Sequence, residues 1–201
     1  IQSNHVKDEL SNFINLDNKK IYIKNDFLIE SNYLNKPKLY DFNKKITFLY
    51  VVGPHFYLPY KNLADFVNTM VGLISLNFNF EIKITLTFDE LNRSGLWDDR
   101  LNCVTSFMGY VDNEKRMKEL FVDNTILIST SVTETVGLHV VEATLNGILS
   151  IVPDELYSKC VYGNNNLTYN LFESESLKNL ILSLKNYSNN DCFKLVKSNQ
   201  E

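Results

Sequence analysis

Residues 125–152 contain two apolar runs, Thr125-Ile-Leu-Ile-Ser-Thr130 and Ile148-Leu-Ser-Ile-Val152, on either side of Ser131-Val-Thr-Glu134-Thr-Val136-Gly137-Leu138-His139-Val-Val-Glu142-Ala-Thr-Leu-Asn-Gly147. β-Branched runs favour buried strands, and the middle segment favours a turn followed by a helix over 136–146. The order strand, turn, helix, strand predicts a parallel crossover unit. Such a turn directs the backbone N–H groups of a helix N-terminus into a crevice, where they suit a phosphate. Glu134, just before the helix, and Glu142, in its second turn, are expected to border that crevice.

The rest of the chain repeats this alternation of strands and helices. Strands are predicted over 46–52, 80–87, 102–108 and 167–172, and helices over 61–76, from Asp112 onward, and from 174 or 175 to about 185. Strands that alternate with helices of about 10–15 residues predict an α/β fold, a doubly wound, Rossmann-like parallel sheet. Ligands of such sheets bind beyond the carboxyl ends of the strands. The loops that begin at Gly53, Gly109 and Ser131 are therefore expected to converge on one crevice.

Composition and charge narrow the class of protein. The chain has 201 residues and a net charge of −4, and it lacks a basic patch, so nucleic acid is not an expected partner. No apolar run approaches the ~18 residues of a membrane span. The three cysteines, Cys103, Cys160 and Cys192, have no metal-binding spacing. Asp98-Asp99 has no second acidic cluster beside it. No metal site and no disulfide framework are therefore expected.

At the sequence level the chain divides into four parts. Residues 45–187 are predicted to form the Rossmann-like domain. Residues 29–44 are polar and are interpreted as a linker or surface loop. Residues 1–28, with a short strand over 20–25, are interpreted as the end of a preceding domain, and 188–201 as a C-terminal tail. Because the first residue is Ile1 and not Met, we expect a fragment of a longer protein.

The 131–147 pattern resembles a known motif. Ser131, Glu134, Gly137-Leu138, Glu142-Ala143 and Gly147 match the motif of family 4 (group 1) GT-B glycosyltransferases, in their C-terminal, nucleotide-sugar-binding domain. Outside the motif, Phe107-Met-Gly109-Tyr110-Val111 resembles the family's loop before a helix, and Pro59-Tyr-Lys61-Asn62-Leu63 resembles the start of the domain's first helix. The resemblance covers residues 45–185 and is strongest to bacterial capsule and O-antigen transferases. On the same comparison, residues 1–28 resemble the end of the N-terminal acceptor domain.

The resemblance implies a role for each site residue. It implies that Lys61 and Glu134 are the catalytic residues: Lys61 neutralises the leaving diphosphate, and Glu134 contacts hydroxyls of the donor sugar. Glu142 would accept hydrogen bonds from the ribose hydroxyls. The remaining nucleotide-sugar contacts would come from the backbone and side chains of Ser131, Thr135, Val136, Gly137, Leu138, Gly109, Tyr110, Val111, His55 and Asn62.

Three positions depart from the family pattern. Family members commonly have Gly-Arg shortly before the lysine, whereas Gly53 is followed by Pro54-His55. Lys61 would then neutralise the diphosphate with help from His55 or from backbone N–H groups. The Phe before the motif Gly is replaced by Val136, and the Pro before the motif Ser by Thr130. His139, inside the motif helix, is interpreted as a packed or surface residue.

The expected activity follows from the resemblance. It implies a retaining transferase that moves a hexose from a UDP- or GDP-sugar, without a metal or other cofactor, to a surface polysaccharide or a lipid-linked oligosaccharide. The protein would be cytoplasmic, with the full-length form associated with the inner face of the plasma membrane. The fragment would be inactive without its N-terminal domain. Two alternatives remain: a degenerate donor domain that serves as a non-catalytic scaffold, and a GT-B-like nucleotide-sugar epimerase.

Overall fold

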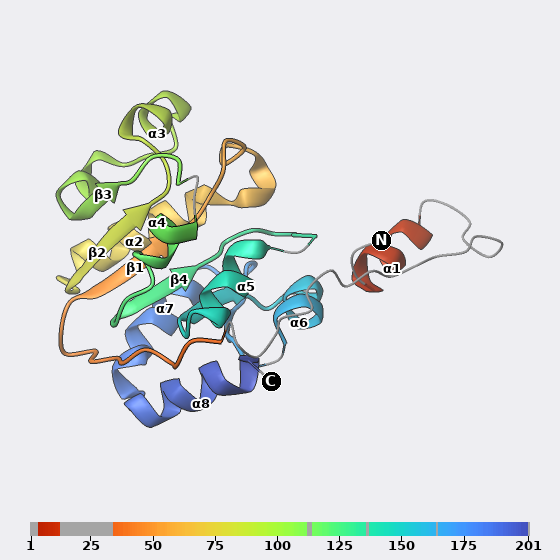
Figure 1. Ribbon diagram of the computed structural model, residues 1–201. Helices are drawn as coiled ribbons and strands as arrows, with labels where there is room; N and C mark the ends of the chain where they lie inside the picture. The colour runs from red at the N-terminus through yellow and green to blue at the C-terminus, as the bar shows by residue number, and fades with distance from the viewer. Residues whose placement is uncertain (1–3, 13–33, 112–113, 136, 164, 201) are drawn as a thin grey trace.

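The computed structural model describes residues 4–12, 34–111, 114–135, 137–163 and 165–200 (Figure 1). Within these residues six strands form one parallel sheet in the order β3-β2-β1-β4-β5-β6. The strands are β1 Ile46–Tyr50, β2 Phe80–Ile84, β3 Thr105–Phe107, β4 Thr125–Ile128, β5 Leu149–Pro153 and β6 Leu167–Tyr169. This confirms the predicted doubly wound, Rossmann-like α/β fold.

The strand order places a switch point between β1 and β4. From β1 the chain winds outward through β2 and β3, and from β4 it winds the other way through β5 and β6. β1 and β4 are neighbours, with Phe48 level with Ile126. The loops that leave their carboxyl ends therefore turn to opposite faces of the sheet and leave a crevice between them. This crevice is where the fold itself favours a ligand.

Helices cover both faces of the sheet. Their bounds are α1 Asn4–Ser11, η2 Pro59–Lys61, α2 Leu63–Ser75, α3 Phe88–Ser94, η3 Asp99–Val104, α4 Glu114–Lys118, α5 Leu138–Leu145, α6 Leu156–Tyr162, α7 Ser176–Ser183, η4 Leu184–Asn186 and α8 Asn189–Gln200. Buried residues of α2, α7 and α8 belong to one core, and those of α5 and α6 belong to a second core on the other face. Strand side chains alternate between the two, since Phe48 and Tyr50 face the first core while Leu49 faces the second.

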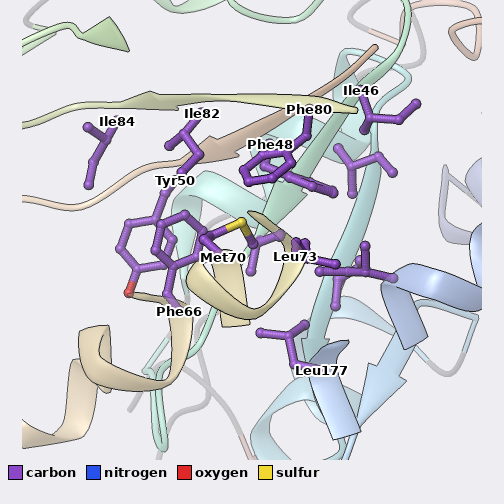
Figure 2. Close-up of a cluster of buried hydrophobic side chains, with 14 of the residues drawn as sticks. Ile46, Phe48, Tyr50, Phe66, Met70, Leu73, Phe80, Ile82, Ile84 and Leu177 are labelled. Atoms are coloured by element: carbon purple, nitrogen blue, oxygen red, sulfur yellow. The ribbon is translucent and has the colours of Figure 1, made fainter. Parts of the chain in front are cut away.

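The core between β1 and α2 is aromatic (Figure 2). The rings of Tyr50 and Phe66 stack with their centroids 4.2 Å apart, and Met70 and Leu73 of α2 are fully buried near Phe48. The apolar residues of α2 recur at the helical spacing, which explains why 61–76 could be predicted as a helix. This packing fixes the N-terminus of α2, and with it Lys61, against the end of β1.

The described part of the predicted linker, 34–44, packs along the amino ends of the strands. The Tyr40 hydroxyl donates to the Thr125 carbonyl oxygen at 2.9 Å and accepts from the Leu149 backbone N–H at 2.8 Å. The Tyr40 side chain is buried. Because Gly147 has φ +78° and a Cβ there would strike the Lys36 carbonyl, its lack of a side chain allows this close approach. The segment thus joins β4 to β5 at the edge opposite the crevice.

Other expected elements differ in their extent. The strand expected over 80–87 ends at Ile84, and Thr87 instead caps α3 in a capping box with Glu90. The strand expected from 102 begins at Thr105, after η3. The tail 188–201 forms α8, whose Cys192 and Val196 are buried in the first core. The strand expected over 20–25 lies outside the described residues.

The N-terminal helix α1 lies apart from the sheet in Figure 1, and it contacts α6. Among the helices that the structure describes, none has both the length and the apolar character needed to cross a membrane.

Candidate functional site

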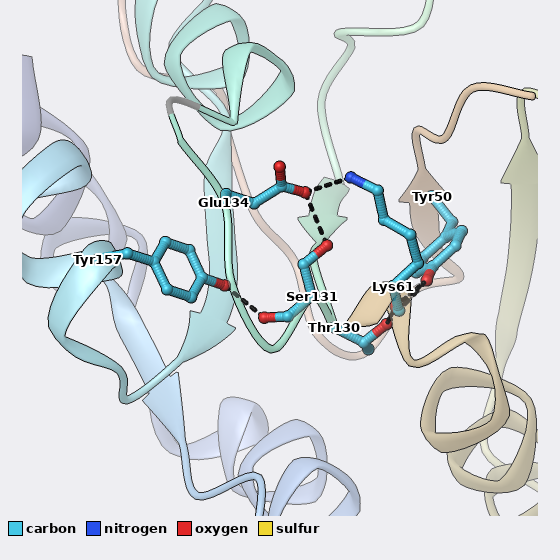
Figure 3. A network of polar contacts seen from close by, with 6 residues as sticks. All are labelled: Tyr50, Lys61, Thr130, Ser131, Glu134 and Tyr157. Atoms are coloured by element: carbon cyan, nitrogen blue, oxygen red, sulfur yellow. Dashed lines mark hydrogen bonds and ion pairs between the residues drawn. The ribbon is translucent and has the colours of Figure 1, made fainter. Parts of the chain in front are cut away.

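Lys61 occupies the end of η2, directly after the loop that leaves β1. Pro59 begins this short helix, and Asn62 adopts a left-handed conformation (φ +49°) that ends η2 and leads into α2. The αL conformation is one that Asn tolerates better than most residues. The sharp turn between η2 and α2 points the Lys61 side chain toward the loop that follows β4, as Figure 3 shows.

Hydrogen bonds join the η2 backbone to that loop. The Thr130 hydroxyl donates to the Lys61 carbonyl oxygen at 2.9 Å and lies 2.7 Å from the Tyr50 hydroxyl. The Val132 backbone N–H donates to the Tyr60 carbonyl oxygen at 2.7 Å. These contacts connect the ends of β1 and β4, the two strands of the switch point. The positions of Lys61 and Glu134 are therefore fixed relative to each other by backbone contacts.

Lys61 and Glu134 form an ion pair (Figure 3). The Lys61 Nζ donates to Glu134 Oε1, and the Ser131 hydroxyl donates to the same oxygen at 2.8 Å. The two side chains are only 19% and 12% exposed, so solvent screens the pair less than it screens a surface pair. The Lys61 Nζ also lies 5.1 Å from the centre of the Tyr60 ring. The two residues predicted to be catalytic are thus bonded to each other.

The start of α5 lies beside this pair. Gly137 precedes the helix with φ +57°, and a Cβ there would overlap the Tyr162 hydroxyl of α6. Only glycine fits this position. Thr135 is exposed, and Val136 lies outside the described residues. From α6, the Tyr157 hydroxyl donates to the Ser131 carbonyl oxygen. The loop between β4 and α5 is thus supported from two sides.

A cavity of about 260 Å³ opens at the carboxyl end of the sheet. The chain segments after β1, β2 and β3 and the helices α4 and α5 supply its wall. The lining residues are Val51, Val52, Gly53, Lys61, Thr85, Tyr110, Val111, Met117, Leu138, His139 and Glu142. Its position is the crevice that the strand order favours.

The structure brings many of the predicted site residues to this cavity. Lys61, Tyr110, Val111, Leu138 and Glu142 line it. Glu134 is connected to it through its ion pair with Lys61, and Ser131 through its hydrogen bond to Glu134. The remaining described residues of the predicted site, namely His55, Asn62, Gly109, Thr135 and Gly137, are not among the lining residues.

His55, the predicted helper of Lys61, is exposed in the loop after β1. Its ring stands edge-on to that of Tyr57 at a centroid distance of 6.4 Å. Gly109 adopts φ +63° and turns the chain so that Tyr110 and Val111 face the cavity. Gly109 therefore shapes the cavity wall through its backbone, without contributing to the lining itself.

His139, interpreted from the sequence as a packed or surface residue, lines the cavity, and so do five other residues that were not among the predicted site residues: Val51, Val52, Gly53, Thr85 and Met117. His139 is half-buried in the first turn of α5 and lines the cavity together with Lys61 and Glu142. Burial lowers the pKa of His139 to about 4, an effect that the Glu134 carboxylate opposes and the Lys61 ammonium reinforces. The imidazole is therefore neutral at pH 7. His139 and Glu142 are three residues apart in α5, so both lie on one helix face. Because Glu142 was predicted to line the site, this spacing could have predicted that His139 lines it too.

Among the described residues, no group of three or more His, Cys, Asp and Glu side chains is arranged to hold a metal ion. Among the lining residues that the structure describes, the charged side chains are Lys61 and Glu142, and Lys61 is paired with Glu134. An anionic group near Lys61 and a group rich in hydroxyls near Glu142 would complement them.

Comparison with known proteins identifies the fold. No protein-family model and no curated protein sequence matches the chain. Among solved structures, a mutant of S. aureus TarM, in complex with Fondaparinux, alpha-GlcNAc-glycerol and UDP, aligns with a TM-score of 0.73 at 14% identity, over 100% of this chain and 39% of that one. The chain has the fold of a GT-B glycosyltransferase domain.

Two further GT-B structures align over most of the chain. The UDP-forming α,α-trehalose-phosphate synthase of Burkholderia vietnamiensis has a TM-score of 0.59 at 9% identity, over 79% of this chain and 41% of that one. Sucrose-phosphate synthase of Thermosynechococcus elongatus has a TM-score of 0.57 at 16% identity, over 77% and 41%. The chain thus spans about two fifths of the length of these glycosyltransferases.

Proposed function

We propose that this chain contains the donor-binding domain of a glycosyltransferase and that its cavity binds a nucleoside-diphosphate sugar. One observation carries the proposal. Lys61, from the end of η2, and Glu142, from α5, line the same cavity at the switch point of a parallel sheet. A cation and a carboxylate in one cavity suit a ligand that has a diphosphate and a ribose.

The proposed chemistry assigns one task to each group. Breaking a glycosidic bond to a diphosphate leaves negative charge on the phosphate oxygens. The Lys61 ammonium and the backbone N–H groups at the start of α5 would stabilise that charge without a metal ion. Glu142 would accept hydrogen bonds from the ribose hydroxyls. Glu134 would turn to the hydroxyls of the donor sugar as the diphosphate takes its place beside Lys61.

The names of two structural neighbours support the proposal that the ligand is a nucleotide. One neighbour is a complex that contains UDP, and another is named for forming UDP. A UDP-sugar is therefore the first donor to test, with a GDP-sugar as the second. We further propose retention of configuration at a transferred hexose and a polysaccharide or lipid-linked oligosaccharide acceptor. The acceptor would be bound by an N-terminal domain, at the cytoplasmic face of the plasma membrane, as the sequence resemblance implies.

Titration calorimetry of the full chain with UDP, GDP, UDP-glucose and GDP-mannose tests the proposal. We expect at least one nucleotide to bind with a Kd in the micromolar range, which corresponds to about −8 kcal/mol. Lys61→Met and Glu142→Ala should each weaken binding at least tenfold, a change of about 1.4 kcal/mol. Glu173→Ala, at an exposed carboxylate before α7, is the matched control and should bind as the unmodified chain does.

Two outcomes would contradict the proposal. If no nucleotide binds, the domain is a scaffold that has lost its donor site. If a UDP-sugar binds and is converted to its epimer, as an NMR spectrum of the recovered nucleotide sugar would reveal, the protein is an epimerase on the same fold.

A further inference from the structure

The His139 imidazole faces the cavity and has no hydrogen-bond partner among the described residues. It lines the cavity with Lys61 and Glu142. Because Lys61 and His139 line the same cavity, a diphosphate inside it would interact electrostatically with both side chains. The wall therefore offers a second basic side chain beside Lys61.

The surroundings of the His139 imidazole favour its neutral form, and an anion bound nearby would favour its protonated form. Burial and the Lys61 ammonium disfavour the protonated ring, and the Glu134 carboxylate favours it. A diphosphate would add negative charge to this balance and favour the protonated ring. Among the residues that the structure describes, the charged or titratable side chains that line the cavity with His139 are Lys61 of η2, Tyr110 of the loop after β3 and Glu142 of α5, and Glu134 of the loop after β4 pairs with Lys61. Arg116 and Lys118 are exposed on α4, whose Met117 lines the cavity.

We propose that His139 is a second cationic contact for the diphosphate: its imidazole is neutral before the diphosphate binds and takes up one proton from solvent when it does. The proposal rests on the proposed function. It also explains how the site could supply positive charge although Gly53 is followed by Pro54-His55 and not by the arginine common in the family. Lys61 is partly neutralised by Glu134, and the imidazolium would supply the positive charge that an arginine would otherwise give. No bond to carbon or phosphorus forms or breaks in this step.

The sign of the pH dependence follows from the proton uptake. Because the bound state holds a proton that the unbound state does not, binding strengthens as the pH falls. The strengthening begins near the pKa of His139 in the bound state and stops below its pKa in the unbound state. UDP-glucose is the appropriate probe, since its diphosphate is esterified at both ends and does not itself titrate in the neutral range.

Calorimetry of the full chain with UDP-glucose, repeated near neutral pH in buffers of different ionisation enthalpy, measures the proton uptake directly. We expect up to about one proton per UDP-glucose bound, and roughly tenfold tighter binding at about pH 6 than at about pH 8. In His139→Gln the uptake should vanish and the affinity should become nearly independent of pH. Imidazole NMR signals of the unmodified chain should show one histidine that becomes protonated on addition of UDP-glucose.

The possible outcomes separate this inference from the proposed function. Binding without proton uptake would overturn the role of His139 and leave the donor site standing. Uptake that persists in His139→Gln would assign the proton to Glu134 or Glu142, and uptake lost only in His55→Gln would assign it to the loop after β1; both overturn the inference. If UDP-glucose and GDP-mannose both fail to bind, the proposed function falls and this inference falls with it.

Discussion

At the scale of single residues, the central feature is the ion pair between Lys61 and Glu134. The Lys61 ammonium that a diphosphate would need is already paired with the Glu134 carboxylate. Lys61 donates to Glu134 in a pair that is largely shielded from water. A diphosphate must therefore compete with the carboxylate or share the ammonium with it. The sequence resemblance placed Lys61 and Glu134 in one site but gave no reason to expect a bond between residues 73 positions apart.

Glu134→Gln tests this competition. The amide can still accept the Ser131 hydroxyl but carries no charge, so we expect UDP to bind several-fold more tightly. Asp154→Asn, which removes the charge from the exposed ion pair between Asp154 and Lys159, is the matched control and should leave UDP binding unchanged. Weaker binding of UDP by Glu134→Gln in calorimetry would show that the carboxylate does not compete with the diphosphate.

The lowered pKa of His139 also predicts how the stability of the folded chain depends on pH. The pKa of His139 is lowered to about 4 in the folded chain, below the ~6.5 of an unfolded chain. The unfolded state therefore binds a proton between these values and the folded state does not, so stability falls as the pH falls from about 6.5 to about 4. The contribution is at most about 3 kcal/mol. Urea unfolding at about pH 7 and about pH 5 should show a smaller loss of stability for His139→Gln than for the unmodified chain; equal losses would contradict this.

At the scale of elements, the loop between β4 and α5 depends on Gly137. Its positive φ and the adjacent Tyr162 hydroxyl both exclude a side chain. Gly137→Ala should lower the free energy of unfolding by at least about 2 kcal/mol. Gly95 is the matched control, because it has φ +68° but nothing near its Cβ position. Gly95→Ala should cost about 1 kcal/mol by denaturant unfolding. Equal costs at the two sites would mean that Tyr162 yields without penalty.

The main elements could be predicted because their patterns are local. The apolar runs of β1, β4 and β5 and the helical spacing of α2 are legible in the sequence. Thr87-x-x-Glu90 is a capping-box pattern, but Thr87 lies at the end of the run that begins with β2 and was therefore assigned to the strand predicted over 80–87. The contact of Tyr40 with β4 and β5 joins residues more than 80 positions apart, and no local pattern encodes such a contact.

The candidate site divides in the same way. The motif residues Glu134, Gly137 and Glu142 could be read from their spacing, and the fold then places Glu142 at the cavity. The neutral state of His139 depends on burial and on Lys61, which comes from another element. Similarly, whether His55 or His139 faces the cavity depends on how the loop after β1 folds, which spacing does not reveal.

At the scale of the whole molecule, α8 completes the first core. Cys192 and Val196 are buried, and the Asn189 side chain accepts from the Tyr40 backbone N–H at 2.6 Å. A chain that ends at residue 187 should therefore lose several kcal/mol of stability and unfold at least about 10 °C lower. Thermal unfolding followed by circular dichroism checks this. Unchanged melting of the shortened chain would show that α8 is dispensable.

Two point variants test the burial of α8 without removing the helix. Val196→Ala removes buried methyl groups and should cost about 1–2 kcal/mol. Val122→Ala, at a residue that is 44% exposed, should change the stability by less than about 0.5 kcal/mol. Similar costs for the two variants, measured by urea unfolding, would contradict the position of α8 against the core.

A crystal structure of the full chain with UDP bound tests the proposed nucleotide-sugar site most directly. We expect the diphosphate beside Lys61 and the start of α5, and the ribose hydroxyls at Glu142, with the Lys61–Glu134 contact lengthened or broken. UDP bound at another edge of the sheet, or a cavity that stays empty at saturating UDP while Lys61 remains paired with Glu134, would contradict the claim that the β1/β4 switch point is a nucleotide-sugar site.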